Sequence, residues 1–370
     1  MTLAAGDSIQ AIDTPALVVD ADAMRRNIDA MAAFAARHEI ALRPHAKTHK
    51  SATIARMQLA AGAVGVCVQK LSEAEALAAG GVTDIFITNE LIAPSKLARL
   101  AVLAGRIQLA VAVDSSLGID RLAAALKAAG TSLAVFVEID VGQGRCGVPP
   151  AAAGALAHQV VSHGLRFAGL HAYHGRAQHL RSSVEREAAI RHAVSAVHAA
   201  QSSITSAGMH CPLVTGAGTG SFGFEAASGV YGELQCGSYV FMDADYAVNE
   251  PTAGMPRFEH ALFVKSQVIS RGVAHAVVDA GHKAHAIDSG LPRVWGGAFT
   301  FANGGDEHGI LTLPHGRKEE LPALGETIWL VPGHCDPTVN LHDVCIAVRG
   351  GLEHGVVEAV WPVDARGCLT

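Results

Sequence analysis

Apolar segments of strand length alternate, over the first two thirds of the chain, with stretches in which apolar residues recur at helical spacing. This alternation is typical of parallel strands connected by helices, and it predicts an α/β fold. The predicted strands are 16–20, 41–44, 65–69, 84–89, 107–113, 132–140, 167–173, 212–217 and 233–243. The predicted helices include 23–37, 72–79, 94–104, 122–129, 151–163 and 183–207.

Nine strands are one more than a (β/α)8 TIM-type barrel uses. Polar residues or glycines crowd the carboxyl ends of the later strands, where an active site forms in such a barrel. The segment 16–20 ends without such a cluster. We therefore expect it to lie outside the barrel.

The pattern changes after about residue 250, where short strand candidates at 262–269, 274–279, 327–331 and 343–349 are separated by Gly and Pro turns. This texture predicts a mainly β C-terminal domain. We expect residues 21–249 to form the barrel, and residues 1–20 plus 250–370 to form a β-rich domain that also takes the N-terminal strand.

The amino-acid composition argues against a disordered chain, a nucleic-acid-binding protein and a membrane protein. Half of the 370 residues are hydrophobic and 17% are charged, which excludes global disorder. The net charge is −6 and no basic run is evident, so nucleic acid is not an expected partner. No apolar run reaches about 20 residues, and the N-terminus lacks a signal-peptide pattern, so we expect no membrane partner and a cytoplasmic location. The seven cysteines form no CxxC pair and are interpreted as mostly reduced thiols.

The stretch RPHAKTHK follows the first predicted barrel strand and places two lysines and two histidines within eight positions. Nearby cations and burial disfavour an ammonium ion, and a neutral amine is the form that makes a Schiff base. Lys47 is the candidate. The competing interpretation is a basic surface loop, which the strand-end position makes the weaker one.

Two glycine-bearing loops follow other strands. VGQGRCG leaves Arg145 projecting over the barrel mouth, or else it is a tight turn with a solvated arginine. TGAGTGS, residues 215–221, has the spacing GxGxG where a dinucleotide fold needs GxGxxG, so we favour phosphate binding by its backbone N–H groups. The next strand adds Gly237 and Ser238 nearby.

Two further segments carry candidate chemistry. In GHCDPTVNLHD, residues i and i+2 of an extended segment share a face, so His334 and Asp336 can bind one cation. One imidazole and one carboxylate, completed by water, suit Mn²⁺ or Mg²⁺ better than a closed zinc site. The segment YHGRAQH ends a strand and offers Tyr173 and His179 for stacking or proton transfer. In both segments the competing interpretation is a set of structural or solvated polar groups.

Together these motifs resemble the fold-type III pyridoxal-phosphate enzymes, which have an alanine racemase-like N-terminal barrel. Within them, the sequence resembles the metal-activated D-threonine aldolase and 3-hydroxy-D-aspartate aldolase family. The resembling stretches span about Asp13 to Asp343 and include DTPALVVD, LRPHAKTHK, VEIDVGQGRCGV, FAGLHAYHG, TGAGTGS and PGHCDPTVNLHD.

The resemblance implies roles for individual residues. Lys47 holds pyridoxal 5'-phosphate, Arg145 faces its pyridine nitrogen, and Gln69 and Tyr173 flank its ring. The phosphate lies among Gly218, Thr219, Gly237 and Ser238, with Tyr239 nearby. His334 and Asp336 hold the divalent metal, and His179 takes the proton of the substrate's β-hydroxyl. The resemblance also implies a homodimer with the active site at its interface.

The implied reaction is retro-aldol cleavage of a small D-β-hydroxy-α-amino acid, of D-threonine or D-phenylserine type, to glycine and an aldehyde. The first alternative is 3-hydroxy-D-aspartate, which gives glycine and glyoxylate and whose second carboxylate Arg176 could meet. D-serine or hydroxyaspartate dehydratases of the same fold type carry a His-x-Cys metal pair, whereas Asp336 stands at that place here. This difference favours aldol cleavage. Alanine racemization leaves the His-x-Asp segment without a role, and non-catalytic carriers of the cofactor lack the second domain.

Overall fold

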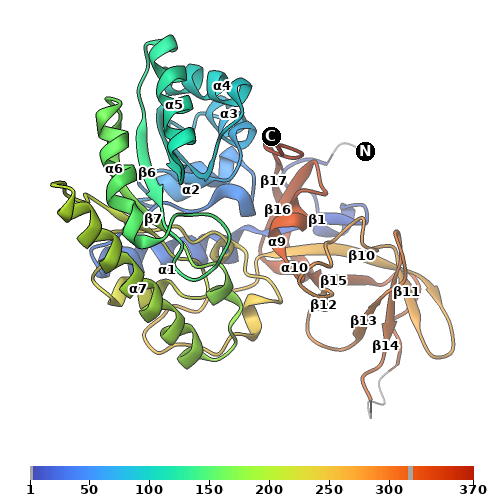
Figure 1. The fold of residues 1–370 in the computed structure, drawn as a ribbon. Helices are drawn as coiled ribbons and strands as arrows, with labels where there is room; N and C mark the ends of the chain where they lie inside the picture. The colour runs from blue at the N-terminus through green and yellow to red at the C-terminus, as the bar shows by residue number, and fades with distance from the viewer. Residues whose placement is uncertain (1–2, 316–319) are drawn as a thin grey trace.

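The structure, a computed structural model, describes residues 3–315 and 320–370. A ring of parallel strands and helices lies beside a mainly antiparallel β region (Figure 1). The parallel sheet has the strand order β2-β9-β8-β7-β6-β5-β4-β3. Its strands are β2 (Ala41–Leu42), β3 (Val66–Val68), β4 (Asp84–Glu90), β5 (Gln108–Val113), β6 (Ala134–Glu138), β7 (Arg166–Ala172), β8 (Val214–Gly216) and β9 (Glu233–Leu234).

The two edges of this sheet meet. The Val64 N–H donates to the carbonyl of Leu42 at 2.9 Å, and the Cys67 N–H donates to the carbonyl of Pro44 at 2.8 Å. These bonds join the chain around β2 to β3, so the sheet curls into the predicted barrel. The carboxyl ends of all eight strands therefore surround one opening.

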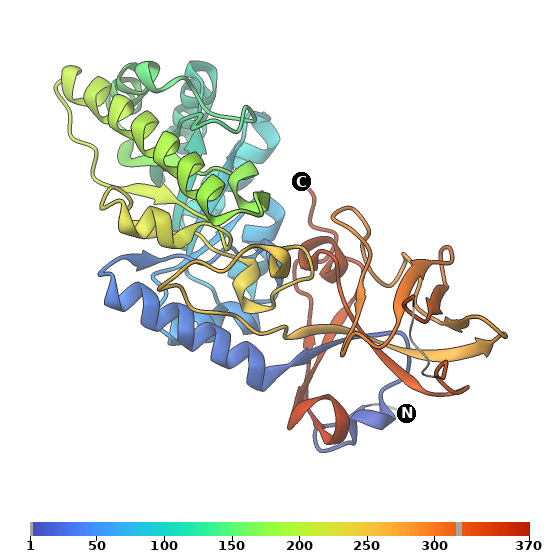
Figure 2. The same ribbon diagram turned by 90° about the horizontal axis from the view of Figure 1, so that it is seen from below.

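Helices cover the outside of the barrel (Figures 1 and 2). Helix α1 shows why they form: Asp20 accepts the N–H groups of Asp22 and Ala23 at its start, and Met24, Ile28 and Met31 recur on the buried face. The helices are α1 (Ala21–Arg37), α2 (Ala52–Ala60), α3 (Leu71–Ala79), α4 (Pro94–Ala104), α5 (Ser116–Ala129), α6 (Ala153–Ser162), α7 (Ser183–Ser206) and α8 (Phe222–Ala227). Helices α2 and α8 were not among those that the periodicity predicts.

The strand outside the barrel is confirmed. Strand β1 (Ala16–Asp20) pairs antiparallel with β10 (Leu262–Arg271) and parallel with β16 (Val344–Arg349). The N-terminal strand thus lies among the C-terminal strands, and α1 leads from it to the barrel (Figure 2). The other strands of this region are β11 (Ala276–Val278), β12 (Arg293–Val294), β13 (Thr300–Asn303), β14 (Gly309–Thr312), β15 (Thr327–Val331) and β17 (Val356–Pro362).

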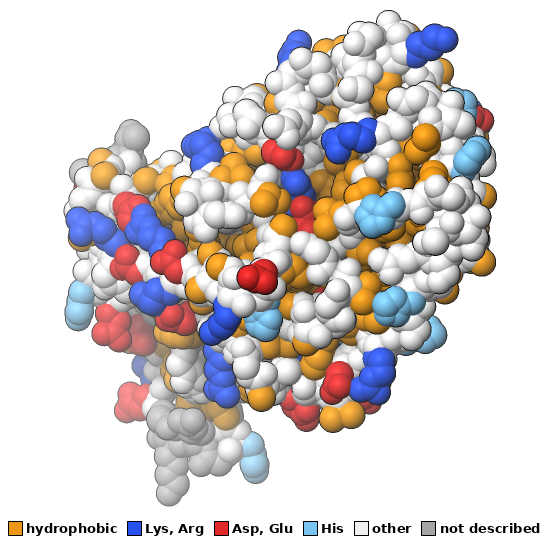
Figure 3. All heavy atoms as spheres, turned by 90° about the vertical axis from the view of Figure 1, so that its left-hand side faces the viewer, with side chains coloured by type: hydrophobic (Ala, Val, Ile, Leu, Met, Phe, Trp, Pro, Cys, Tyr) orange, Lys and Arg blue, Asp and Glu red, His pale blue; other side chains and the backbone are white. Residues whose placement is uncertain are grey.

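The domain boundaries at residues 20 and 250 stay a prediction. Residues 1–2 and 316–319 of the predicted β-rich domain lie outside the described residues. Among the described helices, none has both the length and the apolar character needed to cross a membrane. On the side of the molecule shown in Figure 3, basic and acidic side chains are interspersed with hydrophobic ones.

Two predictions of local structure were wrong. Residues 233–243 do not form one strand, because β9 ends at Leu234 and Ser238–Val240 form a 3-10 helix. His334 and Asp336 do not lie on an extended segment, because helix α9 (Cys335–Val339) begins directly after His334. The Asp243 carboxylate accepts the Cys335 N–H at 3.1 Å, and the Thr338 hydroxyl donates to the His334 carbonyl at 2.7 Å. Both bonds stabilise this helical turn.

Candidate active site

A cavity of about 250 Å³ lies at the carboxyl ends of the barrel strands. Eight of the predicted site residues line it: Lys47, Gln69, Arg145, Tyr173, Gly218, Thr219, Gly237 and Ser238. They come from loops that follow different strands, which explains how positions nearly 200 residues apart converge. The remaining lining residues are His45, Thr48, Thr88, His171, Ala217, Gln235 and Tyr246.

Lys47 lies on the short 3-10 helix Ala46–Thr48 that follows β2. Its Nζ atom donates to Asp336 Oδ2 at 2.7 Å. Burial lowers the pKa of Lys47, but the Asp336 carboxylate more than offsets this, so the pKa is raised. The expectation that the ammonium form is disfavoured was therefore wrong for this arrangement, because the sequence pattern did not place a carboxylate beside the amine.

Arg145 lies on the loop after β6. Asp140 Oδ1 accepts the N–H groups of Gly142 and Gly144 at 2.9 and 3.1 Å, and Gly144 has a φ of 65°. This turn directs the Arg145 guanidinium over the Tyr173 ring, 5.7 Å from its centre. Arg145 and Tyr173 thus lie against each other in the lining of the cavity.

The side chain of Gln178 stabilises the glycine-rich loop after β8 through two hydrogen bonds. The side-chain oxygen of Gln178 accepts the Gly220 N–H at 2.8 Å, and its amide donates to the Ser221 hydroxyl at 2.7 Å. A Cβ atom on Gly218 would lie 2.5 Å from Gln178 Oε1. A side chain at Gly218 would therefore displace the Gln178 amide and disturb the hydrogen bonds that it makes to the loop.

Gly237 forms a second close approach. A Cβ atom there would lie 2.7 Å from Thr48 Oγ1 and 2.9 Å from the His45 carbonyl oxygen. The backbone of Gly237 thus packs directly against the segment that carries Lys47. These glycine backbones leave room for a phosphate among main-chain atoms, so the cavity fits the phosphate end of the predicted cofactor.

Tyr239 contributes differently from the other predicted residues. Its ring is fully buried behind the cavity, where its hydroxyl accepts from Gln58 Nε2 at 3.1 Å. Its backbone N–H donates to Thr219 Oγ1 at 3.0 Å. Tyr239 therefore supports Thr219 instead of lining the cavity itself.

His334 and Asp336 come together although helix α9 intervenes. His334 Nε2 lies 4.0 Å from Asp336 Oδ2, and the other ring nitrogen lies 2.6 Å from Asp288 Oδ2. Burial raises the pKa of Asp336, but Lys47 and His334 outweigh it and hold the pKa well below its usual range. Among the described residues, Asp336 Oδ1 is buried without a hydrogen-bond partner. An ionised carboxylate with a free oxygen beside an imidazole fits a divalent cation.

His179 lies at the edge of the site, on the 3-10 helix Arg176–His179 after β7. Half of its side chain is exposed, and its Nδ1 lies 2.6 Å from Asp245 Oδ2. Its ring centre is 5.8 Å from that of Tyr246, which lines the cavity. Sequence analysis missed Asp245, Tyr246 and Asp288. Asp245 and Tyr246 lie just beyond the predicted strand 233–243, where no helix or strand was expected, and Asp288 stands 46 residues from its histidine.

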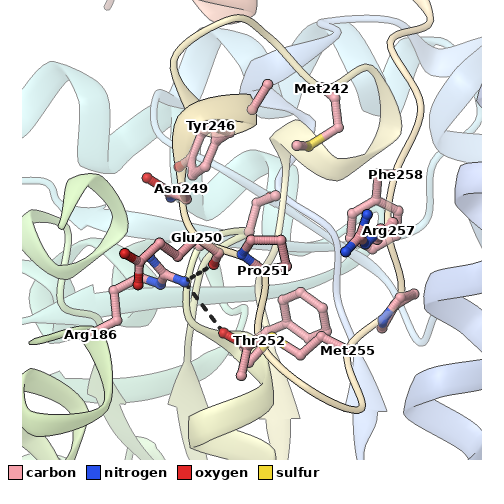
Figure 4. A pocket seen from close by; sticks show the side chains of 15 residues that line it. Arg186, Met242, Tyr246, Asn249, Glu250, Pro251, Thr252, Met255, Arg257 and Phe258 are labelled. Atoms are coloured by element: carbon pink, nitrogen blue, oxygen red, sulfur yellow. Dashed lines mark hydrogen bonds between the residues drawn. The ribbon is translucent and has the colours of Figure 1, made fainter. Parts of the chain in front are cut away.

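A second cavity of about 250 Å³, shown in Figure 4, shares Thr219 and Tyr246 with the first. Arg186 lies along its wall, and its guanidinium donates to the Glu250 carbonyl and to the Thr252 hydroxyl. This arginine is only 2% exposed and also donates to the carbonyls of Leu180 and Arg181. Its main role is to anchor the chain that runs past the active site.

The barrel, the Lys47 cavity and the attached β region define the class of enzymes with an alanine racemase-like barrel. The family described as "Alanine racemase, N-terminal domain" matches residues 19–245, and a serine dehydratase domain matches residues 261–348.

Two curated relatives are similar over nearly the whole chain. D-threonine aldolase of Arthrobacter sp. is 45% identical over 98% of this chain and 95% of its own length. 3-Hydroxy-D-aspartate aldolase of Paracoccus denitrificans is 43% identical over 96% of this chain and 92% of its own length. The crystal structure of D-threonine aldolase from Filomicrobium marinum is 46% identical, covers 100% of both chains and has a TM-score of 0.95. The chain belongs to the D-threonine aldolase and 3-hydroxy-D-aspartate aldolase family of lyases.

Proposed function

We propose that this protein is a carbon-carbon lyase that uses pyridoxal 5'-phosphate and a divalent metal ion to cleave D-β-hydroxy-α-amino acids. The products are glycine and an aldehyde, and D-threonine and D-phenylserine are the preferred type of substrate. One observation carries the proposal: the Lys47 amine and the His334 and Asp336 pair lie side by side at the barrel mouth. A racemase would use the amine and leave the second pair without a role.

The cavity residues would hold the cofactor. Lys47 would bond its aldehyde, Arg145 would face the pyridine nitrogen, and Gln69 and Tyr173 would flank the ring. The phosphate would lie among Gly218, Thr219, Gly237 and Ser238. When bound, pyridoxal phosphate delocalises the electron pair that bond cleavage leaves on Cα.

His334 and Asp336 would hold the cation, and their donor set favours Mn²⁺ or Mg²⁺. When bound, the cation supplies Lewis acidity to a substrate oxygen. His179 accepts the proton of the β-hydroxyl on its Nε2 atom, since its Nδ1 atom is bonded to Asp245. Tyr246 and Tyr173 line the Lys47 cavity, where their rings would shield the reacting atoms from water.

A second candidate substrate is 3-hydroxy-D-aspartate, which would give glycine and glyoxylate. Arg176 favours it, because this exposed arginine lies on the same short 3-10 helix as His179. Its guanidinium could pair with the second carboxylate. The family likeness also supports a homodimer with the active site at its interface, which sedimentation analysis of the purified protein tests.

One assay tests reaction, cofactor and metal together. The purified protein, with pyridoxal phosphate added, is given D-threonine, D-phenylserine or 3-hydroxy-D-aspartate, with and without Mn²⁺. L-Threonine serves as the stereochemical control. Metal-dependent release of glycine and aldehyde supports the proposal, and the ratio of kcat/KM values ranks the substrates. Formation of a 2-oxo acid and ammonia would identify a dehydratase instead.

A further inference from the structure

The exposed imidazole of His179 contacts the buried carboxylate of Asp245. The His179 side chain is 50% exposed, whereas that of Asp245 is 9% exposed. Their closest atoms, His179 Nδ1 and Asp245 Oδ2, lie 2.6 Å apart. Because an ionised carboxylate only accepts hydrogen bonds, Nδ1 carries a proton in this pair, and in the neutral imidazole Nε2 is then the nitrogen with the free lone pair.

Arg181 fixes the other carboxylate oxygen. Its Nη2 atom donates to Asp245 Oδ1, and its Nη1 atom donates to the Asp245 carbonyl and to Asn249 Oδ1, both at 2.8 Å. The carboxylate therefore cannot rotate away from the histidine without losing the arginine. Each of its two oxygens has a donor.

The same short segment contacts the chain that carries the metal-ligand candidates. The Ala244 N–H donates to the Pro332 carbonyl at 2.9 Å, and the Asp245 N–H donates to the Gly333 carbonyl at 3.2 Å. The Asp243 carboxylate accepts the Cys335 N–H at 3.1 Å. Residues 243–245 thus join His179 on one side to the segment before Asp336 on the other.

We propose that Asp245 is a positioning residue for cleavage, which holds His179 in the tautomer and orientation that let Nε2 accept the β-hydroxyl proton. This inference rests on the proposed function. In the step, the proton moves from the β-hydroxyl to Nε2, the O–H electron pair forms the C=O bond of the aldehyde, and the Cα–Cβ pair stays on Cα. Arg181 is the partner that orients Asp245.

Asp245→Asn tests the proposal because Arg181, a hydrogen-bond donor, determines the orientation of the asparagine side-chain amide at this position. The asparagine oxygen would accept from Arg181, and its NH₂ group would face His179 Nδ1. That arrangement forces the proton onto Nε2 and removes the base. We expect kcat to fall by about 10²-fold to 10⁴-fold, the usual contribution of a general base.

A second substitution separates this role from a structural one. In Asp245→Asn combined with Arg181→Met, the amide is free to turn its oxygen toward His179 Nδ1. We expect the double variant to regain at least about tenfold in kcat over Asp245→Asn alone. Asp120→Asn is the control, because Asp120 on helix α5 pairs with His163 at 2.9 Å and neither residue lines the cavity. Its kcat should equal that of the wild type.

The intact holoenzyme supplies an independent measurement. D-Alanine has the amine and carboxylate of a substrate but no β-hydroxyl. Its binding is measured by titration, with the absorbance of the cofactor as the signal. The D-alanine concentration at the midpoint of this titration should be the same for Asp245→Asn and wild type. Retention of wild-type kcat in Asp245→Asn would overturn the positioning role. A kcat of the double variant that does not exceed that of Asp245→Asn would also overturn it. So would a D-alanine midpoint that differs between Asp245→Asn and wild type. Failure of the wild type itself to cleave any D-β-hydroxy amino acid would instead overturn the proposed function.

Discussion

Lys47 Nζ lies 2.7 Å from Asp336 Oδ2, although the two residues are 289 positions apart in the chain. The amine proposed to bind the cofactor and the carboxylate proposed to bind the metal are therefore direct neighbours. An amino acid that takes the place of the Lys47 amine in this cavity lies within reach of a cation on Asp336. The proposed cofactor and metal would thus act on adjacent atoms of one substrate.

Replacing Lys47 by alanine removes the only amine in the described lining of the cavity. We expect Lys47→Ala to lose the visible absorbance band that pyridoxal phosphate gives with wild type, and to lose cleavage. Reduction with borohydride followed by peptide mass analysis gives a direct measurement. The cofactor should remain on the peptide that contains Lys47 in wild type, and on no peptide in the variant. Labelling of Lys50 instead, in wild type, would contradict the assignment.

Asp288 orients His334 through the 2.6 Å contact with Nδ1 and leaves Nε2 facing Asp336. Partners of this kind typically change metal affinity by about 10-fold to 100-fold when they are replaced. We expect Asp288→Asn to raise the Mn²⁺ concentration for half-maximal activity by that factor, with kcat at saturating metal nearly unchanged. Asp306→Asn is the control, because Asp306 pairs with His282 at 2.9 Å in the same β region.

The barrel and most of the site were predictable because the information is local. Strand β1 ends as predicted at Asp20, and the loops with Lys47, Arg145 and Gly218 each follow a strand whose apolar pattern is clear. Parallel strands bring such loops to one end without any need to know the contacts between them.

The contacts that orient the chemistry were not predictable in the same way. Asp245 reaches His179 across 66 positions, and it lies just beyond the predicted strand 233–243, where the sequence predicts no helix or strand. Helix α9 is stabilised in part by the hydrogen bond from the Cys335 N–H to Asp243, which is a tertiary contact between distant segments. Single-sequence patterns report periodicity, and they do not report which side chain meets which across the barrel mouth.

The buried ion pair between Lys50 and Glu73 is expected to contribute to the free energy of unfolding. Lys50 Nζ lies 2.5 Å from Glu73 Oε1, and both side chains are less than a tenth exposed. The second oxygen of Glu73 accepts the N–H groups of Gln69 and Lys70, which positions the Gln69 segment at the cavity. Lys50→Met leaves a buried carboxylate without its cation, so we expect a loss of about 3–5 kcal/mol in the free energy of unfolding.

Urea unfolding followed by tryptophan fluorescence measures this loss. Arg191→Met is the matched control, because Arg191 forms an exposed ion pair with Glu187 at 2.9 Å on α7, where such a pair is worth about 1 kcal/mol or less. Equal effects of Lys50→Met and Arg191→Met would contradict the importance of burial.

Glu225 makes stability depend on pH. Its side chain is 1% exposed, and burial raises its pKa from 4.5 to about 7, although the Ser221 hydroxyl donates to Oε1 at 2.7 Å. Between these pH values the native state binds a proton that the unfolded chain has released, so this group's contribution is complete below pH 4.5 and is lost as the pH rises through 7. The loss amounts to about 3 kcal/mol. Glu225→Gln, which cannot ionise, should melt at the same temperature as wild type at pH 4 and at a higher temperature at pH 8.5. The surface substitution Glu187→Gln should show no such divergence, and parallel melting curves for Glu225→Gln and wild type across this range would contradict the assignment.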